Sequence, residues 1–187
     1  DVDGSGMKVH TKMPNSKGSR SVSLIILAAG RGTRMNSDLP KVLHRIGAVP
    51  LLHHAMATGA VLDPECTVVV TGHGHEAVAN AATAYDNSVL TVRQDEQLGT
   101  AHAVLQAKGV MQGAGGDVIV LYGDTPFICP ETLSAMLDAR SHNDVVVLGF
   151  NAIDPGRYGR LITTGDALDR IIEYKDASDD ERTITLC

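Results

Sequence analysis

The feature that most constrains the fold is a near-continuous apolar run from Val22 to Ala29, which ends in a basic, glycine-rich loop at residues 30–34. Such a run is typical of a strand buried on both faces, the usual state in a parallel sheet. Further apolar runs occur at Thr67–Thr71, Val89–Val92, Val118–Tyr122 and Val145–Phe150. We therefore expect a sheet of mostly parallel strands, with helices on both of its faces.

Segments with helical character separate these runs. They begin near Leu51, at Glu76–Ala84, at Gly99-Thr100 and at Pro130-Glu131, where proline and an acidic residue occupy the first turn. Residues 160–164 and 168–172, on either side of Gly165-Asp166, predict a hairpin. The alternation of strands and helices predicts an α/β protein with a three-layer, Rossmann-like fold and a mixed, mostly parallel sheet.

Composition excludes several classes of function. The net charge of −6 argues against a nucleic-acid or anionic-membrane partner, each of which favours a basic surface. No apolar run is long enough to cross a bilayer. The three widely spaced cysteines give no disulfide framework or zinc spacing, so we expect a cytoplasmic protein. Residues 1–20 are interpreted as an unstructured tail or expression remnant, and residues 21–187 as one domain.

The loop after the first apolar run is the first candidate for chemistry. In open α/β sheets, ligands bind outside the carboxyl ends of the strands. Glycines let backbone amides approach a phosphate, and Arg31, Arg34 and Lys41 supply positive charge nearby. The alternative is a tight turn with solvated arginines. Met35 replaces the third glycine of a dinucleotide-binding motif, and the Gly-Lys-Ser/Thr of a P-loop is absent.

Asp124 is the second candidate, because it follows the run Val118–Tyr122 and should reach the same sheet edge as the glycine loop. Mg²⁺ prefers oxygen ligands and often binds through one or two carboxylates together with substrate phosphates. The sequence position therefore favours a magnesium ligand. The alternative is an aspartate that caps the following turn.

Two other polar segments have weaker signals. Residues 94–100 carry glutamine amides suited to a base edge, although an ordinary polar loop is the simpler interpretation when this segment is taken alone. Tyr158-Gly159-Arg160 and Glu173 flank the predicted hairpin, and Glu173 is either a sugar ligand or a surface charge. His73 and His75 lack a third ligand nearby, and we assign them no role.

These segments, taken in order, resemble a known family. The stretches Leu27–Met35 and Leu39–Leu43 are similar to the signature of sugar nucleotidyltransferases. The later segments Gln97–Thr100, Tyr122–Asp124, Tyr158–Arg160 and Glu173–Asp176 narrow the resemblance. Together they resemble the nucleotidyltransferase half of the bacterial bifunctional N-acetylglucosamine-1-phosphate uridyltransferase/glucosamine-1-phosphate acetyltransferase family, which implies the nucleotide-diphospho-sugar transferase fold.

The resemblance implies an activity and a set of roles. The expected reaction joins UTP to N-acetylglucosamine 1-phosphate with Mg²⁺, and supplies UDP-N-acetylglucosamine for cell-wall and lipopolysaccharide synthesis. Arg34 and Lys41 would bind the triphosphate, and Asp124 would hold the metal. The expected substrate contacts are Leu27, Ala28, Ala29 and Gly30 for uridine and phosphate, Gln94, Gln97, Gly99 and Thr100 for uracil, and Tyr122, Gly159 and Glu173 for the sugar.

Two alternatives remain open at this point. One is a nucleotidyltransferase for another nucleotide or sugar, such as a thymidylyl- or cytidylyltransferase. The other is a non-catalytic module that binds nucleotide sugars. The resemblance also implies that the domain continues past Cys187, through two asparagines that contact the sugar and the metal. It further implies an acetyltransferase half, which forms a homotrimer in the full-length family.

Overall fold

The computed structural model describes residues 20–30, 32, 35 and 37–187. Arg31 and Arg34 lie outside the described residues, as does the predicted tail apart from Arg20. The chain forms two compact units, with the boundary after Ser134, inside helix α4 (Pro130–Arg140). Each unit is described separately, and a single domain over residues 21–187 stays a prediction.

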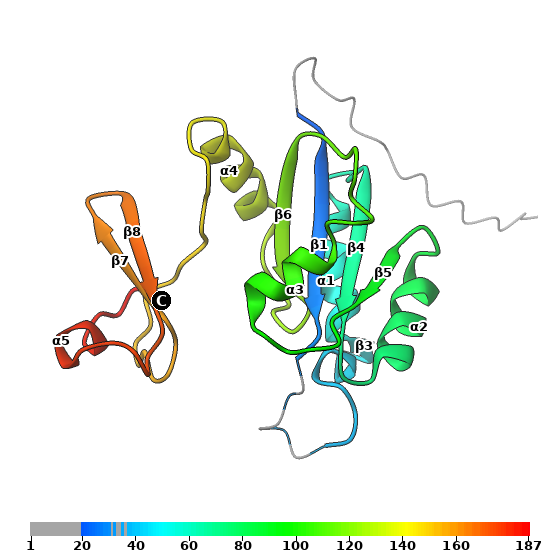
Figure 1. Cartoon of the computed structure of the whole chain (residues 1–187), viewed down its shortest axis with the longest axis horizontal. Coiled ribbons are helices and arrows are strands. Elements are labelled where there is room, and N and C mark those ends of the chain that lie inside the picture. The colour runs from blue at the N-terminus through cyan, green and yellow to red at the C-terminus, as the bar shows by residue number, and fades with distance from the viewer. Residues whose placement is uncertain (1–19, 31, 33–34, 36) are drawn as a thin grey trace, which may run out of the picture. The chain divides into compact units, whose positions relative to one another are not determined.

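The first unit is built around a four-stranded parallel sheet (Figure 1). Its strands are β1 (Val22–Ala28), β4 (Cys66–Thr71), β5 (Leu90–Arg93) and β6 (Asp117–Tyr122), in the order β5-β4-β1-β6. All seven residues of β1 are buried, because this strand pairs on both sides, with β4 and with β6. The parallel sheet predicted from the apolar runs is confirmed.

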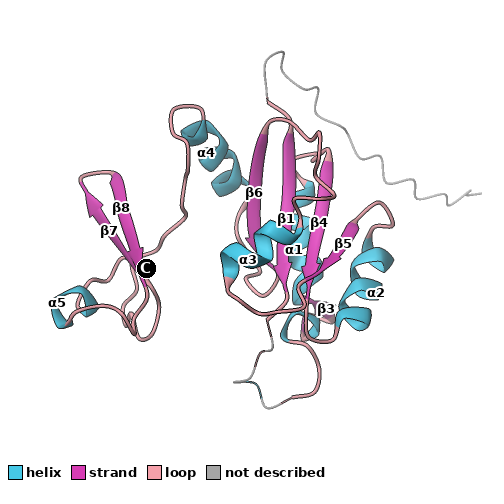
Figure 2. Ribbon diagram, viewed as in Figure 1, coloured by secondary structure: helices cyan, strands magenta, loops and turns pink. Residues whose placement is uncertain are grey.

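Helices cover both faces of this sheet (Figure 2). The helix α3 (Thr100–Gln106) packs on one face, where Ala103 and Ala107 contact a core that includes Ile25, Leu27 and Val68. The helices α1 (Leu51–Ala60) and α2 (His75–Tyr85) pack on the other face. The three-layer α/β architecture predicted from the sequence is confirmed.

Short elements join β1 to α1 near the carboxyl edge of the sheet. They are η2 (Lys41–Leu43), β2 (Arg45–Ile46) and β3 (Val49–Pro50). Within the described residues, no helix combines the length and the apolar character needed to cross a bilayer.

Strand β6 corrects one expectation. The run Val118–Tyr122 predicts burial on both faces, yet Val118 and Tyr122 are each 50% exposed and Val120 is 39% exposed. These residues align with Ser23, Ile25 and Leu27 of β1, so they belong to the face covered by α3. The seven-residue α3 packs on β1 and β4 and leaves this side of β6 uncovered within the unit.

The second unit is centred on the predicted hairpin, which the structure confirms. Strands β7 (Arg160–Thr164) and β8 (Ala167–Ile172) pair antiparallel. The helix α5 (Asp179–Arg182) follows, with a capping box between Ser178 and Glu181. The Ser178 backbone N–H and the Arg170 guanidinium hold the pKa of Glu181 at about 2, well below its ordinary value.

The strand predicted at Val145–Phe150 is wrong. These residues form no strand, and Val145 is 75% exposed. Antiparallel pairing begins only at the end of the run, where Phe150 exchanges hydrogen bonds of 2.8 and 2.9 Å with Cys187. An apolar run predicts burial but does not name a partner strand, and no strand of the described second unit pairs with residues 145–149.

Gly116 gives a direct test of packing at the start of β6. Its φ is +82°, and an added Cβ would lie 1.9 Å from the Ser21 carbonyl oxygen. We expect Gly116→Ala to lower the free energy of unfolding by at least about 2 kcal/mol, since strain and overpacking add. Urea titration measures this. Gly113→Ala is the matched control, because Gly113 has a φ of +89° but open space around it. Equal losses in both variants would contradict the packing argument.

Candidate functional site

A cavity of about 520 Å³ lies at the carboxyl edge of the sheet, where β1 and β6 end. Its lining comes from separate segments of the chain that the parallel topology brings together. The residues are Leu27, Ala28, Ala29, Gly30, Gly32, Met35, Lys41, Val42, Gln94, Gln97, Gly99, Thr100, Ala103, Tyr122 and Asp124. The structure thus gathers the sequence candidates of the first unit around one cavity, except Arg34, which lies outside the described residues.

The charged pair of this cavity is Lys41 and Asp124. The Lys41 ammonium lies 2.7 Å from the Asp124 Oδ2 atom. Both side chains keep access to the cavity, with exposed fractions of 43% and 30%. No backbone N–H of the described residues donates to the Asp124 carboxylate, so the alternative of a turn cap finds no support. The glycine-loop side of the cavity and the strand-end aspartate therefore meet, as their sequence positions predict.

Local backbone structure fixes Lys41 in this position. The 3-10 turn η2 is closed by hydrogen bonds from Leu43 to Pro40 (2.9 Å) and from His44 to Lys41 (3.1 Å). Val42 is buried in the core and anchors the turn. Gly32 approaches from the preceding loop with a φ of +58°, and a Cβ there would lie 2.9 Å from the Lys41 Cβ. Only glycine permits both this backbone conformation and this approach without strain.

Two glutamines line the opposite side of the cavity. Gln94 is 4% exposed, and its Nε2 donates to the Gly99 carbonyl oxygen at 3.1 Å. The Gln97 Nε2 donates to the Ala29 carbonyl oxygen at 2.7 Å, a contact that joins the loop after β5 to the end of β1. These contacts hold the segment 94–99 against the rim of the sheet.

The remaining two candidates, Gly159 and Glu173, belong to the second unit. They lie side by side, because a Cβ on Gly159 would be 4.0 Å from the Glu173 Oε2. Arg160, the first residue of β7, is 1% exposed. Its guanidinium donates to the backbone carbonyls of Tyr158, Pro155, Gly156 and Arg182. Arg160 therefore serves the folding of this unit.

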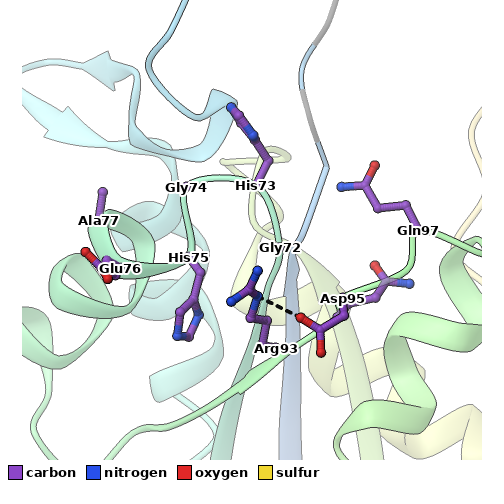
Figure 3. Close-up of a pocket in the computed structure, with 10 residues that line it drawn as sticks. Gly72, His73, Gly74, His75, Glu76, Ala77, Arg93, Asp95 and Gln97 are labelled. Atoms are coloured by element: carbon purple, nitrogen blue, oxygen red, sulfur yellow. Dashed lines mark ion pairs between the residues drawn. The ribbon is translucent and has the colours of Figure 1, made fainter.

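A second cavity, of about 550 Å³, lies on the other side of Gln94 and Gln97. Figure 3 shows that His73 and His75 point away from each other there, and it marks the ion pair between Arg93 and Asp95. The Arg93 Nε lies 2.9 Å from the Asp95 Oδ1. The described residues contain no group of three or more His, Cys, Asp or Glu side chains arranged to hold a metal.

His75 has a structural role in this second cavity. Its Nδ1 lies 2.6 Å from the buried Thr71 hydroxyl, which donates its single proton to the Val92 carbonyl oxygen at 3.0 Å. His75 Nδ1 must therefore be the donor to Thr71. This chain of hydrogen bonds ties the start of α2 to β4 and β5.

Sequence reasoning missed several residues that line or support the first cavity. Val42 and Ala103 contribute apolar lining, as does Met35. Met35 and Val42 lie inside the signature stretches but were given no role, because their types resemble ordinary core or loop residues, and nothing in the sequence marked Ala103. His102 was also missed, although it contacts Gln94 (Nε2 to Nδ1, 3.0 Å) and lies two residues after Thr100 of the Gly99-Thr100 motif.

Comparison with known protein families shows which family contains this cavity. The model of the MobA-like NTP transferase domain family matches residues 24–181, which contain both the cavity and the hairpin unit. The chain belongs to this family of NTP transferase domains. The cavity at the carboxyl edge of its sheet is therefore the candidate active site of an NTP transferase domain.

Close relatives confirm the resemblance drawn from the motifs. The chain is 67% identical over 167 residues to the bifunctional protein GlmU of Cereibacter sphaeroides, and 60% identical over 167 residues to that of a Ruegeria species. Each match covers 89% of this NTP transferase chain and 37% of the relative. The chain thus spans a little over a third of the length of these relatives.

Solved structures show the same fold. A UDP-glucose pyrophosphorylase solved with UDP-glucose superposes with a TM-score of 0.71, covering 89% of this chain and 73% of the other at 19% identity. At that identity, the likeness to this NTP transferase domain concerns the fold alone.

Proposed function

We propose that the chain carries the uridylyltransferase active site that makes UDP-N-acetylglucosamine and pyrophosphate from UTP and N-acetylglucosamine 1-phosphate. The observation that carries the proposal is the convergence of Lys41, Asp124 and the Gly30 loop on one cavity. The identity of up to 67% with bifunctional GlmU proteins supports the choice of substrates. The product would serve the synthesis of bacterial cell-wall precursors.

The nucleotide would lie along the carboxyl edge of the sheet. The backbone of Leu27–Gly30 would contact uridine and phosphate, while Gly99, Thr100 and the two glutamines would contact the uracil. Lys41 would neutralise the triphosphate together with Arg34, which lies outside the described residues. These assignments agree with the lining of the cavity and with its ligand-sized volume.

A magnesium ion fits the oxygen chemistry of Asp124. The carboxylate is reachable from the cavity and already pairs with one cation, the ammonium of Lys41. Mg²⁺ commonly binds through one or two carboxylates and completes its shell with substrate phosphates and water. When bound, the metal supplies charge neutralisation at the phosphates. The Asp124 carboxylate would hold it at the edge of the sheet.

The reaction needs positioning more than proton transfer. An oxygen of the sugar phosphate attacks the α-phosphorus of UTP, the new O–P bond forms, and the bond to the β-phosphate oxygen breaks to release pyrophosphate. The second pKa of a phosphate monoester is about 6, so this nucleophile is largely ionised at neutral pH without a general base. Lys41 and Arg34 would stabilise the negative charge that develops on the leaving pyrophosphate.

The second unit would supply the sugar contacts. Gly159 and Glu173 lie together at the base of the hairpin, and the Glu173 carboxylate is exposed and able to accept hydrogen bonds from sugar hydroxyls. Tyr122, which lines the first cavity, is the sugar contact that the resemblance implies within the first unit.

A nucleotide panel tests the proposed function. Pyrophosphate release is measured with N-acetylglucosamine 1-phosphate and each of UTP, CTP and dTTP, in the presence of Mg²⁺. The same assay is run on a chimaera in which this chain replaces the matching segment of the Cereibacter relative. We expect UTP to give the highest kcat/KM. Higher turnover with CTP or dTTP would overturn the choice of nucleotide.

The alternative of a non-catalytic module that binds nucleotide sugars is tested by the same two proteins. Calorimetric binding of UDP-N-acetylglucosamine with no turnover in either protein would support it. A cytoplasmic location agrees with the free thiols of Cys66, Cys129 and Cys187. Assembly into a homotrimer stays a prediction of the resemblance.

A further inference from the structure

We propose that His102 determines nucleotide specificity by fixing the orientation of the Gln94 amide. The site then accepts a base that carries an N–H at the ring position facing Gln94, and rejects a base that carries a lone pair there. This inference rests on the proposed function, since it concerns the base of the nucleotide in the same cavity. It assigns a role to a side chain that does not line the cavity itself.

The orientation of the Gln94 amide follows from its partners. One end of the amide lies 3.1 Å from the Gly99 carbonyl oxygen. A carbonyl oxygen accepts hydrogen bonds and never donates, so the amide atom facing it must be the NH₂ group. The Gln94 backbone N–H donates to the Thr71 carbonyl oxygen at 2.8 Å and holds the residue at the end of β5. The amide therefore has one orientation that satisfies its surroundings.

His102 uses the other proton of the same NH₂ group. The Gln94 Nε2 lies 3.0 Å from the His102 Nδ1, which must accept with its lone pair. A reversed amide would set an oxygen against the Gly99 carbonyl and against the imidazole lone pair. The first contact would be repulsive, and the second would require His102 to change its tautomer, so His102 adds to the preference that Gly99 sets.

The same geometry defines the tautomer of His102. If Nδ1 accepts, the proton of the neutral ring is on Nε2, which lies 3.1 Å from the amide of Gln106. The Gln106 Nε2 also donates to the His102 backbone carbonyl oxygen at 3.0 Å, so an NH₂ group faces each ring nitrogen, and a neutral imidazole can accept from only one of them. Gln94 is 4% exposed and held by Gly99, whereas Gln106 is only half-buried, so we assign the lone pair to Nδ1, facing Gln94, and expect the Gln106 amide to keep its bond to the carbonyl alone.

The consequence for a ligand lies at the other end of the Gln94 amide. Both Nε2 protons are used, and the Oε1 atom accepts no hydrogen bond from the described residues. Gln94 lines both cavities of the first unit, and the proposal places its Oε1 in the first one, as an acceptor for the base. The N3–H of uracil or thymine satisfies that acceptor. Cytosine carries a lone pair at N3, and two acceptors facing each other repel.

The experiment compares two nucleotides and two variants of the full chain. Calorimetry gives the Kd of UTP and of CTP, and the pyrophosphate assay gives kcat/KM for each. We expect the wild type to prefer UTP by at least about tenfold, the scale of one unpaired buried polar group. His102→Phe keeps a planar ring and removes the acceptor, and its UTP/CTP preference should fall by about fivefold or more.

Two controls separate specificity from folding. In His102→Asn, the side-chain oxygen occupies nearly the place of Nδ1, so the preference should stay within about twofold of wild type. A merely structural role would weaken UTP and CTP binding alike and leave their ratio unchanged. UTP methylated at N3 offers no proton, and should bind the wild type at least about tenfold more weakly than UTP.

The possible results separate a failure of the role of His102 from a failure of the proposed function. An unchanged UTP/CTP ratio in a folded His102→Phe, or equal binding of UTP and its N3-methyl form, overturns the role of His102 while leaving the uridylyltransferase proposal intact. Failure of the wild type to bind any nucleotide overturns the proposed function, and this inference with it. If His102→Phe does not fold, His102→Leu, which also removes the acceptor, takes its place with the same expected loss of preference.

Discussion

Replacing Asp124 by asparagine is expected to lower pyrophosphate release from UTP by at least about 10²-fold, the scale of losing one strong charge-stabilising group at a reacting phosphate. The amide keeps the size of the side chain and removes its negative charge. Asp124 follows β6 and lines the cavity, where, among the described residues, Lys41 is its ionic partner. The loss should appear in kcat and in the metal titration curve, which should shift to higher Mg²⁺.

Asp95→Asn is the matched control for this variant. Asp95 is exposed, pairs with Arg93 and lines only the neighbouring cavity of the first unit. Its turnover should stay within about twofold of wild type, as expected for an exposed ion pair. Equal losses in Asp124→Asn and Asp95→Asn, or an unshifted metal titration in Asp124→Asn, would contradict the assignment.

Lys41→Met should separate two roles of one side chain. Turnover should fall by at least about 10²-fold, because the ammonium that neutralises the triphosphate is gone. Binding of Mn²⁺ without nucleotide should strengthen by about two- to fivefold, because an exposed ion pair no longer competes for the Asp124 carboxylate. Electron paramagnetic resonance of free Mn²⁺ measures the second effect independently of activity.

Lys108→Met serves as the control, since Lys108 is exposed and does not line the first cavity. It should leave turnover and Mn²⁺ affinity near their wild-type values. Weaker Mn²⁺ binding in Lys41→Met would show that the ammonium supports the metal site instead of competing for it.

Much of the fold was predictable because its signals are local. The sequence of the fully buried β1 is a near-continuous apolar run. Because β1 and β6 are parallel, the residues that follow them lie at the same edge of the sheet. That rule alone predicted the meeting of the glycine loop with Asp124. The hairpin was equally visible, since Gly165 supplies the positive φ of its turn.

The features that the sequence did not predict are burial, strand pairing and side-chain orientation, which depend on residues far apart in the chain. Burial of Val118 and Val120 depends on how far α3 extends over the sheet, which a run of apolar residues does not encode. Pairing of residues 145–149 needs a neighbouring strand that the run itself does not specify. The lock between Gln94 and His102 depends on rotamers fixed by the Gly99 carbonyl.

The most direct test of the central claim is a crystal structure of the chain with UTP and Mn²⁺, in which anomalous scattering locates the metal. We expect a metal about 2–2.5 Å from an Asp124 carboxylate oxygen, with the triphosphate beside Lys41 and the base against Gln94. A metal remote from Asp124, or a nucleotide bound instead in the cavity of His75 and Arg93, would contradict it.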